Sequence, residues 1–303
     1  MSENWGFFAR DLHPFDDSLK RRAVQAFEDD FGSGDLTTSI LFGKDKIVVD
    51  AIIVSKSDGV LAGILGARAI LEKGDIDVLE SKSDGDEIHK GDVIIKMRGP
   101  VQEILARERT VLNYLQRMSG IATFSRRLYK RFPKRVLFLR KCDPGLLHGE
   151  KRAVALGGCL THRIGLFDGI LIKENHLDVL YKKNHKEEAI REAILRADEG
   201  RKKIKKFLPI EIETRTLEEA IAAANSLEQL QGPNIIMLDN MSPKQAEECS
   251  ERIRKISRDI IIEASGGITE DKIEPYLRSG ADFVSTSIFV SKSGFLDMSL
   301  EIL

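Results

Sequence analysis

Six short apolar runs in the second half of the chain alternate with amphipathic helical patterns, and this alternation constrains the fold more than any other feature. The runs are VLFL (136–139), GILIK (169–173), FLPIEIE (207–213), NIIMLD (234–239), IIIEAS (260–265) and DFVS (282–285). Segments such as LEEAIAAAN and PKQAEECSERIRKI separate most of them. Strands that alternate with helices at this spacing form a parallel sheet with right-handed crossovers. Six strands, or seven, predict an α/β protein with an incomplete (β/α) barrel or a doubly wound sheet.

The first part of the chain has a different pattern. Residues 17–31 place apolar side chains on one helical stripe, and Gly32 ends this helix. A small and mainly antiparallel sheet with one helix around residues 65–73 is predicted by short apolar runs at 46–54, 58–64, 75–80 and 91–97. A long helical pattern then extends from about Val101 to Phe132, and we expect Gly120 to break it.

Composition limits the classes of protein that remain. The 303 residues include 47 Lys and Arg against 48 Asp and Glu, a formal charge of −1, and 42% of residues are hydrophobic. The charge balance argues against a nucleic-acid surface built on bulk positive charge, and no apolar run approaches the ~18 residues that span a bilayer. Three cysteines without CxxC spacing, and an N-terminus (MSENWGFFARD) without a signal-peptide pattern, predict a cytoplasmic protein without a disulfide framework. We expect neither a nucleic-acid partner nor a membrane.

Polar or charged residues follow every one of the six predicted strands. In chain order they are Arg140-Lys141, Lys173, Glu213, Asp239, Ser265-Gly266-Gly267 and Ser285-Thr286-Ser287. The carboxyl ends of barrel strands form one face of the molecule, where the catalytic residues of such enzymes lie. One lysine after an apolar run is usually a solvated side chain, but six such coincidences predict a catalytic face.

The charges at these positions indicate the kind of ligand. The cations are Arg140, Lys141 and Lys173, with His162-Arg163 shortly before Lys173, and such a cluster suits an anionic substrate. Glu213 and Asp239 lie among these cations and suggest Mg²⁺ carried by a phosphate. The alternative is that both acids only form salt bridges with the lysines. The two small-residue turns after the last strands are typical of a phosphate site, although a glycine after a strand is often only a turn.

These residues lie in segments that resemble one known family. The segment RKCDPGLLHGEKRAVALGGCLTHRIGLFDGILIKENH (140–176) is similar to the core of quinolinate phosphoribosyltransferase, also called carboxylating nicotinate-nucleotide pyrophosphorylase. Further matches are EDDFGSGDLTT (28–38), ARERTVLNYLQRMSGIAT (106–123), IEIET (210–214), IMLDNMSP (236–243), IEASGGI (262–268) and GADFVSTSIF (280–289). Their order and spacing agree with the family from about residue 15 onward.

The resemblance implies a fold and an assembly. The fold would be an N-terminal α+β open sandwich, here residues 1–116, packed on an incomplete α/β barrel, here residues 117–288. Residues 289–303 would return to the N-terminal domain. The assembly would be a homodimer with shared active sites, or a higher oligomer, in which Arg109 is lent by the neighbouring subunit.

The resemblance also implies roles for the strand-end residues. Arg140, Lys141, His162, Arg163 and Lys173 would bind the quinolinate carboxylates and part of the phosphoribosyl pyrophosphate. Glu213 and Asp239 would hold the Mg²⁺–ribose–pyrophosphate assembly, and together with Lys141 and Lys173 they would be the catalytic residues. The turns Ser265-Gly266-Gly267 and Ser285-Thr286-Ser287 would bind the 5′-phosphate.

The chain departs from the family pattern at several positions. Leu139, Cys142, Asp143 and Leu147 stand where the family has three threonines and an arginine, and Thr161 replaces an asparagine. Ser287 replaces a common glycine, and Val290-Ser291 replaces Thr-His. The catalytic charges are retained, so these changes bear on which acid is bound more than on the reaction.

The activity implied is transfer of phosphoribose to quinolinate with decarboxylation, which gives nicotinate mononucleotide, pyrophosphate and CO2 in de novo NAD biosynthesis. Three alternatives remain open. Lys173 could form a Schiff base in an aldolase-type enzyme, the enzyme could act on a different aromatic acid, or the protein could bind a phosphorylated metabolite without catalysis.

Overall fold

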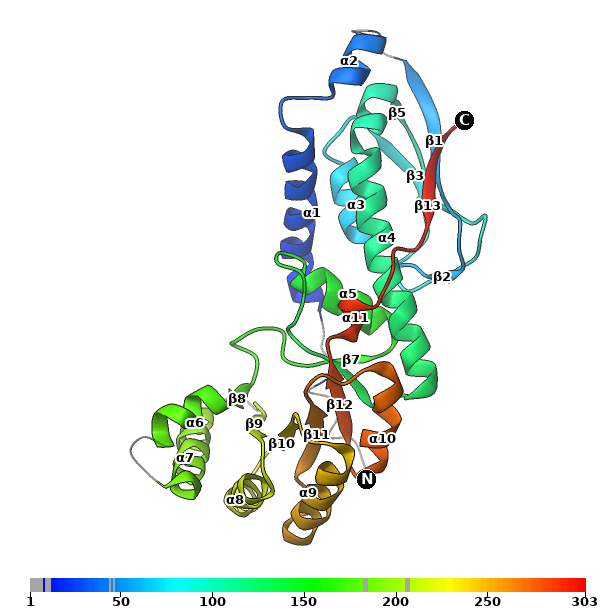
Figure 1. The fold of residues 1–303 in the computed structure, drawn as a ribbon. Helices are drawn as coiled ribbons and strands as arrows, with labels where there is room; N and C mark the ends of the chain where they lie inside the picture. The colour runs from blue at the N-terminus through cyan, green and yellow to red at the C-terminus, as the bar shows by residue number, and fades with distance from the viewer. Residues whose placement is uncertain (1–7, 9–11, 44, 46, 182–184, 205–207) are drawn as a thin grey trace. The chain divides into compact units, whose positions relative to one another are not determined.

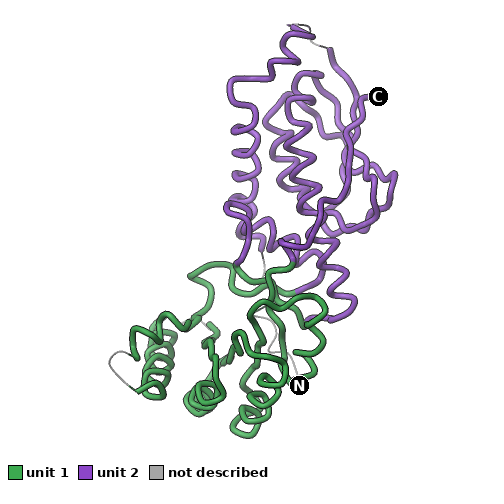
Figure 2. The backbone as a smooth tube through the Cα atoms, viewed as in Figure 1, with its two compact units in different colours: residues 1–10, 135–140, 160–288 green, residues 11–134, 141–159, 289–303 purple. Residues whose placement is uncertain are grey.

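The chain folds into two compact units that are interleaved along the sequence (Figure 2). The computed structural model describes residues 8, 12–43, 45, 47–181, 185–204 and 208–303. Unit 1 comprises residues 1–10, 135–140 and 160–288, and unit 2 comprises residues 11–134, 141–159 and 289–303. The N-terminal stretch apart from Phe8, and residues Lys46 and Phe207 of two predicted strands, lie outside the described residues.

Unit 1 is built on one parallel sheet of seven strands (Figure 1). The strands are β6 (Val136–Phe138), β7 (Leu160–Thr161), β8 (Ile170–Ile172), β9 (Ile210–Thr214), β10 (Asn234–Asp239), β11 (Ile261–Ser265) and β12 (Phe283–Thr286). Their order is β7-β6-β12-β11-β10-β9-β8, and every pairing is parallel. Read from the β8 edge, the strands follow chain order to β12 and continue with β6 and β7. That is the order of a barrel opened between β7 and β8, whereas a doubly wound sheet reverses at its centre. The prediction of an incomplete barrel is confirmed.

The seventh strand, β7, is the one that the apolar runs do not reveal. It has two residues, Leu160 and Thr161, which pair with Leu137 and Phe138 of β6. Two residues are too few to show a hydrophobic period, so no pattern in the sequence marks this strand. Its presence places His162 and Arg163 directly after a strand, like the other candidate residues.

Helices follow the strands of unit 1 and lie along the sheet (Figure 1). They are α6 (Glu174–Tyr181), α7 (Lys186–Ile204), α8 (Leu217–Leu227), α9 (Pro243–Ile256), the 3-10 turn η2 (Glu270–Lys272) and α10 (Ile273–Arg278). Side chains at the N-termini define where two of them begin. Thr216 accepts a hydrogen bond from the backbone N–H of Glu219, and Ser242 forms a capping box with Gln245.

The core of unit 1 includes a residue from the start of the chain. Phe8 packs with Leu137, Leu160, Ile235 and Phe283, all of which are buried. The Phe8 and Phe283 rings meet edge to face with centroids 5.0 Å apart, and the backbone N–H of Thr161 donates to the Phe8 carbonyl at 3.1 Å. Phe8 therefore belongs to the barrel unit, although it lies within the segment 1–116 that was predicted to form the other domain.

Unit 2 combines helices with an antiparallel sheet. The helical elements are η1 (His13–Phe15), α1 (Asp16–Phe31), α2 (Leu36–Phe42), α3 (Ile64–Leu71), α4 (Val101–Arg131) and α5 (Leu147–Gly157), and the chain enters unit 2 again within α11 (Ile288–Ser291). The sheet has the order β13-β1-β5-β3, with β1 (Val48–Ser55), β3 (Asp77–Ser81), β5 (Val93–Pro100) and β13 (Met298–Ile302). Among the residues that the structure describes, the predicted run at 58–64 does not join this sheet, because β2 (Gly59–Val60) pairs only with β4 (Glu87–Ile88).

Helix α4 is the longest element of unit 2, and the expected break at Gly120 is wrong. The helix continues from Val101 to Arg131, and the predicted boundary at residues 116/117 falls inside it. Gly120 is buried, and a Cβ atom there would collide with the carbonyl oxygen of Gly294. The glycine is therefore explained by the close approach of another segment and not by a need for a helix end.

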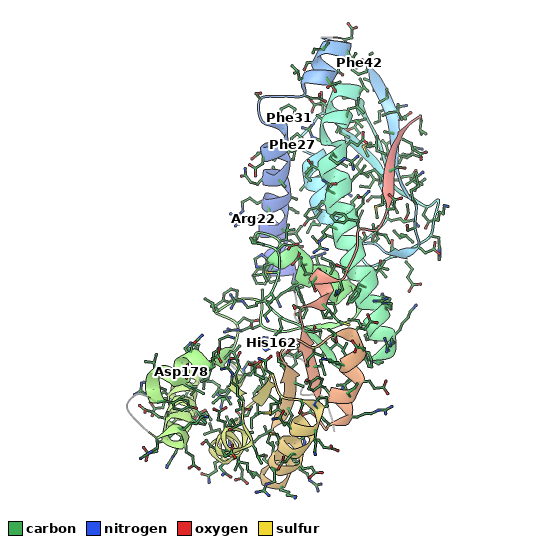
Figure 3. The ribbon with its side chains drawn as sticks, in the orientation of Figure 1. Arg22, Phe27, Phe31, Phe42, His162 and Asp178 are labelled. Carbon is green, nitrogen blue, oxygen red and sulfur yellow. The ribbon has the colours of Figure 1, made fainter. Side chains whose placement is uncertain are left out.

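A cation–π contact joins α4 to α1 within unit 2. The Arg107 guanidinium lies over the Phe27 ring at 4.6 Å from its centroid, and Phe27 and Phe31 are one turn apart on α1 (Figure 3). Such a cation–π contact adds to the burial of the Phe27 ring.

Strand β13 completes the sheet of unit 2. It pairs antiparallel with β1 from Ala51↔Ile302 to Ser55↔Met298. Segments from far apart in the sequence thus form one sheet.

In the described part of the chain, no helix has both the length and the apolar composition needed to cross a membrane.

Candidate active site

The carboxyl edge of the parallel sheet brings the predicted strand-end residues of unit 1 together. Ile172 of β8 is aligned with Ile212 of β9, and Asp239 of β10 is aligned with Ser265 of β11. Lys173 follows β8 directly, and Glu213 is the penultimate residue of β9. In a sheet with a single strand direction, these positions lie along one edge.

Lys173 and Glu213 form an ion pair across neighbouring strands. The Lys173 Nζ atom donates to Glu213 Oε1 at 2.6 Å. The Lys173 side chain is 43% exposed and that of Glu213 is 12% exposed. The lysine is therefore accessible to a ligand, while the pairing holds the acid in a defined position.

Asp239 has partners that the sequence patterns did not identify. Its Oδ2 atom accepts a hydrogen bond from Asn240 Nδ2 at 2.8 Å and lies 3.6 Å from Arg215 Nε. The Arg215 guanidinium also pairs with the carboxylate of Glu174. Arg215 directly follows β9, so the same strand-end rule that selected Glu213 could have selected this cation.

The turn after β11 requires an unusual backbone at two positions. Gly266 has φ +98°, and a Cβ atom there would lie 2.5 Å from Asn240 Oδ1. Asn240 itself has φ +56° and donates its backbone N–H to the Ser265 carbonyl at 3.0 Å. The two loops after β10 and β11 therefore fit only because residue 266 lacks a side chain. Gly267 is exposed at the end of this turn.

The turn after β12 is linked to the turn after β11. The Thr286 hydroxyl donates to the carbonyl of Ile268 at 2.8 Å and accepts from the backbone N–H of Ile288 at 3.3 Å. Ser285 and Thr286 are buried, and Ser287 is half-buried. The two predicted phosphate turns are thus neighbours, as the phosphate hypothesis requires.

His162, which was expected to bind a substrate carboxylate, has its Nε2 atom against two carboxyl groups of the protein. Nε2 lies 2.7 Å from Glu211 Oε2 and 3.8 Å from Glu263 Oε2. His162, labelled in Figure 3, is the residue that directly follows β7 in the chain. Glu211 is the second residue of β9, and Glu263 is the third residue of β11. All three side chains are at most 5% exposed.

Burial dominates the electrostatics of these two glutamates. It raises the pKa of Glu211 to about 8, with a further contribution from the nearby charge of Glu213. Burial likewise raises the pKa of Glu263 to about 8, with Glu211 as the next cause. Neither residue was predicted to belong to the site. The signal that could have found them is an acidic residue inside an otherwise apolar strand of a parallel sheet.

Arg163 and Arg140 provide positive charge near this edge. Arg163 is buried and donates from Nη1 to the Gly169 carbonyl at 3.4 Å, whereas Arg140 is exposed. Burial lowers the pKa of Arg163, and the charge of Arg140 lowers it further. Because the charge of Arg140 affects the pKa of Arg163, the two cations lie in the same region of unit 1.

Two of the predicted site residues, Lys141 and Arg109, belong to unit 2. Lys141 is exposed. Arg109 is exposed on α4 and lines a cavity of about 510 Å³ with Arg117, Asp143 and Phe295. Asp143, which stands where the family has a threonine, accepts from Arg117 Nη2 at 3.1 Å. This departure therefore gives a half-buried arginine an acidic partner.

The two acids at the edge fit a magnesium ion by their chemistry. Glu213 and Asp239 offer carboxylate oxygens at the ends of adjacent strands, with side chains 12% and 16% exposed. Mg²⁺ is usually bound through one or two carboxylates, with substrate phosphates and water completing its coordination. Two partly exposed acids beside a predicted phosphate turn match that donor set.

Comparison with known proteins shows the family to which this chain is similar. The model of the quinolinate phosphoribosyl transferase C-terminal domain matches residues 121–301, and the model of the N-terminal domain matches residues 35–119. A probable nicotinate-nucleotide pyrophosphorylase [carboxylating] from Methanothermobacter thermautotrophicus is 35% identical over 280 residues, which cover 90% of this chain and 95% of that protein. One from Bacillus subtilis is 35% identical over 94% of this chain and 93% of its own.

Solved structures share the whole fold. The nicotinate-nucleotide pyrophosphorylase from Francisella tularensis has a TM-score of 0.78 at 28% identity, covering 95% of this chain and 97% of that chain. NadC from Streptococcus pyogenes has a TM-score of 0.76 at 30% identity, covering 97% of this chain and 99% of that chain. The resemblance stated from the sequence is confirmed along nearly the full length, and the chain belongs to the quinolinate phosphoribosyltransferase family.

Proposed function

We propose that the protein transfers phosphoribose from phosphoribosyl pyrophosphate to quinolinate and releases CO2, which makes it a carboxylating nicotinate-nucleotide pyrophosphorylase, a pentosyltransferase of NAD biosynthesis. Relatives that cover more than nine-tenths of the chain carry this name. The observation that carries the proposal is the set of cations and acids on one sheet edge, with Lys173 paired to Glu213 at 2.6 Å. An edge of this kind suits two polyanionic substrates held side by side.

The residues at the edge have distinct tasks in this reaction. Pyrophosphate leaves C1 of the ribose while positive charge develops there, and the pyridine nitrogen of quinolinate attacks that carbon. Arg140, Lys141, Arg163 and Lys173 hold the carboxylates and neutralise the departing oxygens. The ring then loses its 2-carboxylate as CO2. The electron pair of the broken bond stays at C2, stabilised by the adjacent positive ring nitrogen, until C2 takes up a proton from water. No protein nucleophile is needed, which agrees with a site made of positioning charges.

We propose Mg²⁺ as the cofactor, held by Glu213 and Asp239. When bound, it would neutralise and orient the pyrophosphate oxygens. The turns at Ser265–Gly267 and Ser285–Ser287 would bind the 5′-phosphate through backbone N–H groups, because their hydroxyl and glycine residues leave space for an anion. The contact between Thr286 and Ile268 keeps the two turns together.

The working form in this proposal is a cytoplasmic homodimer, or a higher oligomer built from it, in which Arg109 serves the neighbouring subunit. Arg109 is exposed on α4 and borders a cavity of unit 2, so it is free to meet a ligand or another chain.

Cys159 and Cys249 are buried thiols, and burial raises their pKa to about 12 and about 11. Unreactive thiols of this kind suit a reducing compartment.

A direct assay tests the proposed function. The purified protein is incubated with quinolinate labelled in the 2-carboxylate, phosphoribosyl pyrophosphate and Mg²⁺, and nicotinate mononucleotide and labelled CO2 are measured. We expect equal amounts of both products. Nicotinate lacks one carboxylate, and each charge-assisted contact left unmade costs about 1.5–3 kcal/mol, so quinolinate should be preferred by roughly a hundredfold.

Other outcomes separate the alternatives. Equal rates with both acids would mean that Leu139 and Leu147 accompany a change of substrate. Tight binding of both substrates without any product would identify a protein that binds phosphorylated metabolites without catalysis. Trapping of Lys173 by borohydride with an aldehyde substrate would identify an aldolase-type enzyme.

A further inference from the structure

We propose that Glu211 and Glu263 are positioning residues that hold His162, and through it Arg163, in the geometry that binds the acid substrate. With His162 they form what we call the buried carboxyl–imidazole cluster. This inference rests on the proposed function, because it assigns these residues to the recognition of the carboxylates of quinolinate.

The cluster joins strands that the sheet itself leaves apart. In the order β7-β6-β12-β11-β10-β9-β8, four strands separate β7 from β9. His162 extends from the end of β7 and reaches Glu211 of β9 at 2.7 Å and Glu263 of β11 at 3.8 Å. The hydrogen bond therefore spans the interior of the open barrel. It fixes the loop after β7 relative to the opposite edge, where backbone pairing between β7 and β8 is absent among the described residues.

Stability alone does not account for polar groups at these positions. Layers of barrel interiors are usually filled by branched apolar side chains. A buried ion pair is often no more stable than apolar residues of similar volume, because desolvation offsets the attraction. The cluster is also incompletely satisfied, since Glu211 Oε1 has no hydrogen-bond partner within the described part of the chain. Retaining polar groups here is explained by a task in the neighbouring site.

The cluster is one layer below the catalytic edge. Glu211 and Glu213 are two residues apart on β9, so their side chains face the same side of the sheet. Glu213 pairs with Lys173. Arg163 is the residue after His162 and is itself buried. The negative charges of Glu213 and Asp168 favour the charged form of Arg163 against the effect of its burial. Glu211 is thus linked to both halves of the edge: its hydrogen bond holds His162, the neighbour of Arg163 in the chain, and its strand carries Glu213, the partner of Lys173.

The test compares variants that remove the polar group with variants that keep it. Glu211→Leu should raise the KM for quinolinate by about tenfold or more, the equivalent of one hydrogen bond, and change the KM for phosphoribosyl pyrophosphate less than twofold. Glu263→Leu removes a carboxyl group that lies 3.8 Å from the imidazole without a hydrogen bond, so its effect on the KM for quinolinate should have the same direction and be smaller. Glu211→Gln and Glu263→Gln keep the length and an acceptor, so they should restore most of the affinity. The dissociation constant of quinolinate, measured by calorimetry, should follow the same order.

A matched control distinguishes positioning from a general loss of stability. Asp198 on α7 is another buried acid of unit 1 and pairs with Arg201 at 2.7 Å. Asp198→Asn should lower the thermal midpoint without changing either KM. If the leucine variants behave like this control, the cluster is only structural and the proposal is wrong. If the leucine variants do not fold, Glu211→Ala and Glu263→Ala leave room for water and answer the same question.

Three further results separate a metal site at the cluster, a failure of the proposed function and a failure of this inference alone. Stoichiometric divalent metal that survives dialysis of the wild-type protein and is lost in Glu211→Ala would make the cluster a metal site and overturn the proposal. Wild-type protein without activity on quinolinate would instead contradict the proposed function. Active wild-type protein with unaltered variants contradicts this inference alone.

Discussion

Glu213 and Asp239 lie at the carboxyl ends of two strands, as the penultimate residue of β9 and the last residue of β10, yet their side chains have different partners. Lys173 pairs with Glu213, whereas Asn240 and Arg215 approach Asp239. Both acids keep oxygen atoms at the partly exposed edge. The difference between the two partner sets matters for mutagenesis, because removing Glu213 takes away the acid that pairs with Lys173, whereas Arg215 keeps Glu174 when Asp239 is removed.

We expect Glu213→Gln and Asp239→Asn to reduce kcat by about a hundredfold, because each removes a charge that acts on the developing transition state. The quinolinate dissociation constant should change by much less, since that acid is held by the cations. Steady-state kinetics over a range of Mg²⁺ concentrations and calorimetry with quinolinate measure the two effects. Removal of Mg²⁺ with EDTA should reproduce the loss in the wild-type protein.

The control for this experiment is Glu247→Gln, which changes an exposed acid of α9. Its kcat should equal that of the wild type. Full turnover in both edge variants would exclude Glu213 and Asp239 from the metal site.

At this scale, the sequence predicts residues at strand ends and misses those within strands. Lys173 and Asp239 follow from the rule that barrel chemistry lies at carboxyl ends. Glu211 lies within a strand, and its partner His162 is 49 residues away in the chain. A contact of that separation has no local signal, so only the fold reveals that the two meet.

Helix α4 illustrates the balance between local preference and packing in a single element. Glycine is a poor helix former, and that preference led to the expectation of a break at Gly120. The helix continues because tertiary contacts outweigh the loss of about 1 kcal/mol that one glycine introduces. β7 is the opposite case, since its two residues carry too little pattern to be recognised. Elements whose hydrophobic pattern extends over many residues can therefore be predicted from the sequence. Elements that form only because a neighbouring segment pairs with them cannot.

Gly120→Ala should destabilise unit 2 by about 1–3 kcal/mol, because the added methyl group collides with the Gly294 carbonyl and forces the backbone to move. Chemical denaturation followed by circular dichroism measures the change. The comparison is Gly200→Ala in α7, where a Cβ atom meets nothing within 4 Å. That variant should be more stable by about 0.5–1 kcal/mol. A neutral Gly120→Ala would show that the segment at Gly294 is free to move aside.

For the whole molecule, the alternation of strands and helices predicted a parallel sheet of six or seven strands, and the family resemblance favoured the incomplete barrel over a doubly wound sheet. The interleaving of the two units was less accessible. Phe8 joins the barrel core and β13 joins the sheet of unit 2, and both contacts link distant parts of the chain. Such pairings depend on which hydrophobic surfaces remain uncovered after the local elements form, and that information is not local in the sequence.

The assembly can be tested by complementation. Arg109→Ala and Lys173→Ala should each be nearly inactive, because each removes a cation from a site that holds several anionic groups. If Arg109 serves the neighbouring subunit, a mixed dimer has one site with both defects and one with neither. Random mixing after joint refolding should then restore about a quarter of the wild-type activity. Mixed dimers that form and remain inactive would place Arg109 in its own subunit's site or in none.

The pairing of β13 with β1 also sets an order of events during synthesis. A ribosome makes β1 early and β13 only after every strand of the barrel. The barrel sheet can therefore complete its hydrogen bonds while β1, with the apolar sequence VVDAIIVS, still has one unpaired edge. Unpaired apolar edges attract other chains. The nascent protein thus has its greatest need of chaperone protection at the sheet of unit 2, until the antiparallel partner of β1 emerges.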